Sequence, residues 1–175
     1  MTRWLWLGSL FFFSMPALIF YEQYYFDHKE PYYSCPVQTY LDNITLRNDS
    51  FGKGAFGVSR SGGRTHAGID LSVSVGSPVM AAKSGRVFIA GDDNGYGHYV
   101  EIYHPDGLIT RYAHLSQIKI KEGEWVNQGQ EIGLSGKTGN ANQRNIIPHL
   151  HFEIRYKNQP LNPTTGLLDP KIHIQ

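Results

Sequence analysis

Short hydrophobic stretches alternate with turn residues through the second half of the chain. Residues 79–82 and 86–90 predict two strands, and residues 98–103 alternate polar and apolar side chains as a half-buried strand does. The sequence Pro-Asp-Gly at 105–107 predicts a hairpin turn into a further strand at 108–114. Such short, turn-separated strands are typical of a compact antiparallel sandwich or barrel-like sheet. We therefore predict an all-β fold.

The composition supports this fold and limits the possible functions. The chain has 175 residues, enough for one domain with a real core, and its 19 glycines and 11 tyrosines suit strands joined by tight turns. A formal net charge of +1 gives no electrostatic reason to expect a nucleic acid or an acidic partner. The single cysteine, Cys35, excludes a disulfide within the chain.

The amino terminus is strongly apolar. Arg3 precedes a hydrophobic run at residues 4–21, and Glu22 and Asp27 follow it. This charge order keeps the start of the chain in the cytoplasm and exports the rest. We favour an uncleaved membrane anchor, with cleavage of a signal peptide after Ala17 as the alternative.

The expected organisation is an anchor or signal peptide at 1–21, a connector at 22–48 and the main domain at 49–175. The domain would then lie in the cell envelope, outside the cytoplasm, as a periplasmic domain held at the inner (cytoplasmic) membrane.

Two histidine motifs carry the candidate chemistry. Residues 66–70 have the sequence His-Ala-Gly-Ile-Asp, and if they form a strand, His66, Gly68 and Asp70 share one face. Because Gly68 has no side chain, we expect room for a metal ion between the imidazole and the carboxylate.

The second motif lies about eighty residues later, where His149 and His151 also share one face of a predicted strand. Together the two motifs supply three or four nitrogen and oxygen donors of the kind that zinc binds, usually with one position left for water. The spacing alone allows either or both histidines of the second motif to bind.

Residues 66–70 together with the sequence His-Leu-His-Phe-Glu at 149–153 resemble the M23 family of zinc metallopeptidases, also called the LytM or lysostaphin type. The segments 112–115 and 123–130 resemble two further family motifs. The resemblance implies a LytM domain with a groove roofed by loops. It also implies one zinc ion per chain, with His66, Asp70 and His151 as ligands and with His114 and His149 as catalytic histidines.

The implied activity is zinc-dependent hydrolysis of peptide crosslinks in peptidoglycan. Uncoordinated imidazoles beside a metal site can take a proton from water and pass it to the leaving amine. Two alternatives stay open: a non-catalytic LytM-type module that regulates cell-wall amidases, and a zinc peptidase acting on a protein. Residues 140–148 form a long polar stretch that we expect to make one wall of the groove, and Glu153 is a candidate to orient a ligand.

Overall fold

The computed structural model describes residues 17, 20–21, 23–26, 28–38 and 43–174. Strands dominate these residues and most of them pair antiparallel, which confirms the predicted all-β fold. Residues 1–16 of the expected membrane segment lie outside the described residues. Within the part of the chain that is described, no helix combines the length and the apolar character that crossing a bilayer requires.

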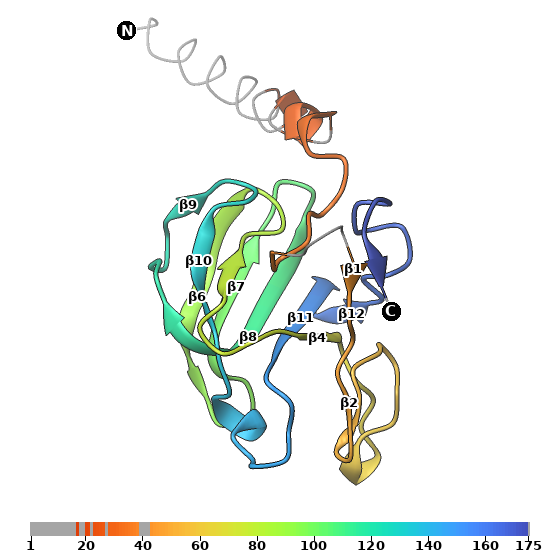
Figure 1. Ribbon diagram of the computed structural model, residues 1–175. Coiled ribbons are helices and arrows are strands. Elements are labelled where there is room, and N and C mark those ends of the chain that lie inside the picture. Colours follow the sequence, from red (N-terminus) through yellow and green to blue (C-terminus); the bar gives the residue numbers. More distant parts are fainter. Residues whose placement is uncertain (1–16, 18–19, 22, 27, 39–42, 175) are drawn as a thin grey trace, which may run out of the picture.

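A nine-stranded sheet forms the body of the domain (Figure 1). Its strands are β4 (Ile69–Ser72), β5 (Pro78–Met80), β6 (Gly85–Asp93), β7 (Gly97–Tyr103), β8 (Leu108–Ile118), β9 (Trp125–Val126), β10 (Glu131–Ser135), β11 (His149–Tyr156) and β12 (Gln159–Leu161). The main path runs β12-β11-β8-β7-β6-β9, while β4 pairs with β11, and β10 pairs with both β5 and β8. The predicted strands at 98–103 and 108–114 correspond to β7 and β8, which form the expected hairpin.

Smaller elements surround this sheet. The parallel pair β1 (Asn43–Ile44) and β13 (His173–Ile174) lies apart from it, and β2 (Asn48–Asp49) and β3 (Gly52–Lys53) form a short hairpin. Two 3-10 turns complete the described elements: η1 (Ser61–Gly63) and η2 (Gly139–Ala141).

Alternation along the strands separates the core from the site. Val100, Tyr112 and Phe152 lie opposite one another in β7, β8 and β11 and are fully buried. Burying a side chain of this size stabilises a fold by roughly 2–3 kcal/mol. Because successive residues of a strand face opposite sides, His151 projects from the other face, away from this core.

Part of the expected connector packs onto the domain. The carboxylate of Glu30 accepts hydrogen bonds from the backbone and the hydroxyl of Ser84, and the hydroxyl of Tyr33 donates to Asp106 at 2.8 Å. Glu30 and Tyr33 are both buried. These contacts, with backbone hydrogen bonds from Tyr33 to Leu167 and from Ser34 to Ala82, hold residues 30–34 against the domain.

Candidate metal site and groove

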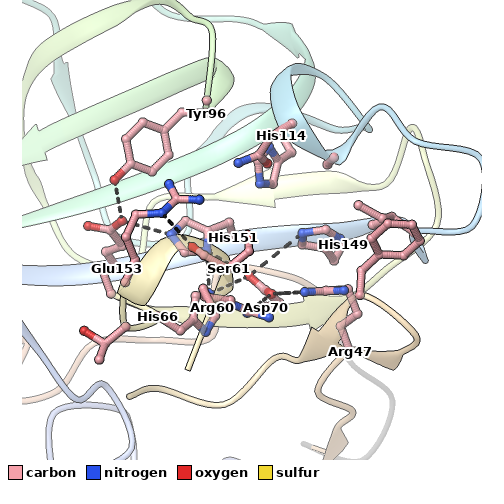
Figure 2. A pocket seen from close by; sticks show the side chains of 18 of the residues that line it. Arg47, Arg60, Ser61, His66, Asp70, Tyr96, His114, His149, His151 and Glu153 are labelled. Carbon is pink, nitrogen blue, oxygen red and sulfur yellow. Dashed lines mark hydrogen bonds and ion pairs between the residues drawn. The ribbon is translucent and has the colours of Figure 1, made fainter. Parts of the chain in front are cut away.

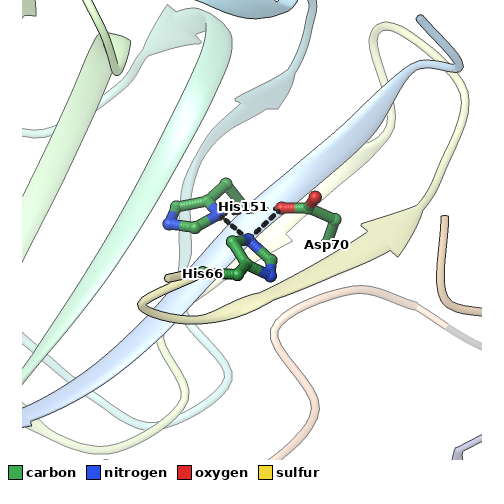
Figure 3. A group of neighbouring side chains, drawn as sticks. All are labelled: His66, Asp70 and His151. Carbon is green, nitrogen blue, oxygen red and sulfur yellow. Dashed lines mark hydrogen bonds and ion pairs between the residues drawn. The ribbon is translucent and has the colours of Figure 1, made fainter. Parts of the chain in front are cut away.

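Three donor atoms from His66, Asp70 and His151 converge on one point (Figure 3). Nε2 of His66 lies 3.0 Å from Oδ1 of Asp70 and 3.0 Å from Nδ1 of His151, and the last two atoms are 2.8 Å apart. All three residues are buried. Tetrahedral zinc with ligand bonds of about 2.0–2.1 Å places its donors about 3.3 Å apart, so a small outward shift of these atoms accommodates the ion.

Strand pairing brings together two of the three donor residues. In the antiparallel pair of β4 and β11, Asp70 lies directly opposite His151, so both side chains leave the same face of the sheet. His66 precedes β4, which begins only at Ile69. The expected strand through His66 is therefore wrong, and an irregular segment with a bend at Gly68 connects this histidine to β4.

The role expected of Gly68 is also wrong. A Cβ atom on this residue would lie 2.2 Å from the carbonyl oxygen of Phe152 and 2.8 Å from Cγ of Glu153. The space beside Gly68 is occupied by β11 and not by a metal site. Glycine is required here because the chain passes so close to the neighbouring strand.

Hydrogen bonds at the far side of each ring orient the two ligand histidines. Nδ1 of His66 donates to the carbonyl oxygen of Ala55 at 2.8 Å, which leaves Nε2 as the acceptor that faces the cluster. Nε2 of His151 lies 2.9 Å from Oε1 of Glu153, which leaves Nδ1 toward Asp70. Glu153 thus contacts a candidate ligand in the manner that the sequence suggested.

Hydrogen bonds within the cluster shift the pKa values of His151 and Asp70 in opposite directions. Burial alone would lower the pKa of His151, but hydrogen bonds to Asp70 and Glu153 raise it to about 9. Burial would raise the pKa of Asp70, and hydrogen bonds from His151 and His66 outweigh it and hold that pKa well below its usual range. Without metal, protonated His151 therefore sits between two carboxylates.

His114 and His149 border the same cluster. Their rings meet edge to face with centroids 5.0 Å apart, and Nε2 of His149 is 3.9 Å from Oδ1 of Asp70. Nδ1 of His149 donates to the carbonyl oxygen of Ile147 at 2.7 Å, and Nδ1 of His114 donates to that of Thr138 at 3.0 Å. Each ring therefore keeps a lone pair on Nε2.

Both of these imidazoles are neutral near pH 7. Burial, together with the neighbouring His151 and His149, lowers the pKa of His114 to about 3. Burial also lowers the pKa of His149. Two uncharged bases thus stand beside the candidate metal site.

A groove of about 1000 Å³ opens over these residues (Figure 2). Asn140, Gln143 and Ile146 line it, so the polar stretch before β11 forms one wall as expected. Arg60 and Arg64 lie on another part of the lining, and Tyr96 borders it next to Glu153.

Sequence reasoning missed the contacts of two arginines with the cluster. Arg47 and Arg60 both donate to Oδ2 of Asp70, the oxygen that faces away from the histidines. Arg47 lies 23 positions before Asp70, with no spacing that would indicate the contact.

Known proteins resemble this chain in sequence and in fold. The model of "Peptidase family M23" matches residues 64–163. The DD-carboxypeptidase/endopeptidase Mpg of Neisseria meningitidis serogroup B is 43% identical over 105 residues, which cover 60% of this chain and 23% of that protein. The murein hydrolase activator NlpD of Escherichia coli is 39% identical over 109 residues, which cover 62% of this chain and 27% of NlpD.

These two relatives are much longer, since the chain matches only about a quarter of their length. Among solved structures, a zinc-containing peptidase from Vibrio cholerae superposes with a TM-score of 0.60 at 29% identity. That match covers 76% of this chain and 41% of the peptidase.

Proposed function

This chain belongs to peptidase family M23, and on that premise we propose that it is a zinc-dependent endopeptidase that hydrolyses peptide crosslinks of peptidoglycan. The observation that carries the proposal is the grouping of His66, Asp70 and His151 with two neutral histidines in one groove. The Mpg and Vibrio cholerae relatives, named as an endopeptidase and as a zinc-containing peptidase, support it.

The donor set fits zinc. Two imidazole nitrogens and one carboxylate oxygen are a common set of three protein ligands at catalytic zinc sites. When bound, zinc lowers the pKa of a coordinated water toward 7 and polarises a carbonyl group. The hydrogen bonds from His66 to Ala55 and from His151 to Glu153 hold both rings in the tautomers that such a site needs.

His114 and His149 act as the general acid and base. Nε2 of His149 or His114 takes a proton from the attacking water and returns it to the leaving amine. Backbone carbonyl oxygens at Nδ1 fix both rings, so no reorientation is needed before the reaction. Burial lowers the pKa of both histidines, so both rings are uncharged at neutral pH and the lone pair on each Nε2 is available to accept a proton.

The main alternative is a regulator that resembles NlpD, which is named an activator. To separate the two, purified peptidoglycan is incubated with the full-length chain, with and without a zinc chelator, and released muropeptides are identified by mass spectrometry. We expect cleaved crosslinks, which the chelator and Asp70→Ala both abolish. Release of muropeptides only when an amidase is added would instead indicate an activator.

A protein substrate is tested in the same way. The chain is also incubated with a panel of unfolded proteins. If it cleaves these proteins but leaves peptidoglycan crosslinks intact, its substrate is a protein and not the cell wall. The masses of the muropeptides also identify which peptide bond is cleaved.

We also propose that residues 1–21 anchor the chain in the inner membrane and place the groove in the periplasm. Arg3 before the apolar run, with Glu22 and Asp27 after it, supports this topology. A reporter that works only outside the cytoplasm, fused after Asn48 or after Gln175, should be active at both positions. An inactive reporter at both would remove peptidoglycan as the substrate.

A further inference from the structure

The two oxygens of Asp70 have separate partners. Oδ1 faces His66 and His151, whereas Oδ2 accepts hydrogen bonds from Nε and Nη2 of Arg47 at 3.1 and 3.0 Å and from Nη2 of Arg60 at 2.9 Å. Three donors saturate Oδ2, because a carboxylate oxygen offers about two lone-pair sites. Only Oδ1 remains for a metal ion. Figure 2 shows Arg47 and Arg60 approaching Asp70 from the side away from His114.

Arg47 also reaches a second carboxylate. Its Nη1 donates to Oδ1 of Asp49 at 2.7 Å, and the other oxygen of Asp49 accepts the backbone N–H of Ile147 at 3.0 Å. The carbonyl oxygen of Ile147 in turn accepts Nδ1–H of His149 at 2.7 Å. An unbroken set of hydrogen bonds therefore joins a candidate metal ligand, Asp70, to a candidate catalytic base, His149.

Burial and charge distinguish this set from an ordinary surface ion pair. The side chains of Arg47 and Asp49 are each only 6% exposed. A buried ion pair loses so much hydration that it is often no more stabilising than apolar residues of the same size, so stability alone does not account for it. Arg60 differs, because its Nη1 atom is buried without a hydrogen-bond partner and Asp70 is its only ion-pair partner among the described residues.

We propose that Arg47 and Asp49 are positioning residues that orient Asp70 toward zinc and, through the backbone of Ile147, hold His149 in place. The inference rests on the proposed function. Arg47 fixes which oxygen of Asp70 binds, and Asp49 neutralises Arg47 and couples it to the groove wall. A guanidinium suits this position because its planar fork serves two carboxylates at once, which a lysine ammonium does not.

The test is a double-mutant cycle on zinc affinity, measured on the purified full-length chain by competition with a chromophoric chelator. Loss of such outer contacts commonly weakens metal binding about 10- to 100-fold. We expect the zinc Kd to rise by that factor in Arg47→Gln and by about tenfold in Asp49→Asn. Because Asp49 acts through Arg47, the double variant should match Arg47→Gln within about threefold. The matched control is Arg86→Gln, an exposed arginine that donates to Gly123 and should leave the Kd unchanged.

The contact with Ile147 requires a second readout. At saturating zinc, Asp49→Asn should lower kcat for crosslink hydrolysis about tenfold or more with KM within about threefold, because His149 loses its support. Additive effects on the zinc Kd, or an unchanged kcat, would overturn the proposal. A wild-type chain without zinc would instead refute the proposed function. If Arg47→Gln does not fold, as judged by urea unfolding, Arg47→Lys replaces it in the cycle with the same criteria.

Discussion

The ring of His114 is held by the backbone of Thr138, whose carbonyl oxygen accepts Nδ1–H at 3.0 Å. The backbone of His114 is itself left-handed, with φ of 64°, and its N–H donates to the carbonyl oxygen of Tyr96 at 2.9 Å. A non-glycine residue in this conformation costs roughly 1–3 kcal/mol. The surrounding contacts maintain this strained geometry, and it directs the imidazole into the groove.

Removing either neutral histidine should separate catalysis from metal binding. We expect His114→Ala and His149→Ala to keep about one zinc per chain and to lose at least about 100-fold in kcat, since each removes a proton-transfer group. Elemental analysis and the rate of muropeptide release measure the two effects. If His149→Ala contains as little zinc as Asp70→Ala, then His149 is a ligand and its assigned role is wrong.

The ligand set makes the opposite prediction. His151→Ala and Asp70→Asn should purify with little zinc and without activity, because each removes one of three donors that converge within hydrogen-bonding distance. Asp70→Asn keeps the size of the side chain and removes its charge and one acceptor oxygen. Full zinc occupancy in both variants would show that the ion binds elsewhere.

The hydrogen bond from His114 to Thr138 can be tested by a substitution at the next residue, Gly139. A Cβ atom on Gly139 would lie 2.3 Å from the backbone nitrogen of Gly97 and 2.6 Å from the carbonyl oxygen of Gly95. Gly139→Ala should therefore push Thr138 away from His114 and lower kcat about tenfold or more, with little change in zinc content.

Gly166→Ala is the matched control for this prediction. Gly166 also has a positive φ, 77° against 61° for Gly139, but a Cβ there would meet no atom within 4 Å. Both variants carry the left-handed penalty of roughly 1–2 kcal/mol, and only Gly139→Ala adds the clash. Equal loss of kcat in the two would show that backbone strain, and not the displacement of Thr138, is responsible.

The sequence indicated which side chains come together better than it indicated the path of the backbone around them. Alternation within a strand placed His149 and His151 on one face, and β11 has that geometry. The same argument failed for His66, because an irregular segment with a bend at Gly68, and not a strand, brings it to Asp70. The sequence alternates at residues 66–70 whether or not these residues form a strand, so the pattern alone did not distinguish a strand from an irregular segment.

The arginines illustrate what local patterns do not contain. Arg47 meets Asp70 because the backbone N–H of Arg47 donates to the carbonyl oxygen of Asp70, and Gly54 packs between these segments. That contact depends on tertiary packing across more than twenty residues. The close approach at Gly68 is similar, since β11 fills the space that the isolated motif suggested for a metal.

The affinity of the chain for zinc should depend on pH. In the metal-free chain, hydrogen bonds to Asp70 and Glu153 outweigh burial and raise the pKa of His151 to about 9. Nδ1 of His151 must lose its proton before it can bind zinc, so one proton is released for each ion bound at neutral pH. The affinity for zinc should therefore rise about tenfold per pH unit from pH 6 to pH 8 and level off above about pH 9. Competition with a chelator of known pH dependence measures this slope.

Glu153→Gln tests the origin of the raised pKa. It removes one of the two carboxylates that stabilise the proton on His151, so the zinc affinity of this variant should level off at a lower pH than that of the wild type. A zinc affinity that does not change between pH 6 and pH 8 would contradict the raised pKa of His151 in the metal-free chain.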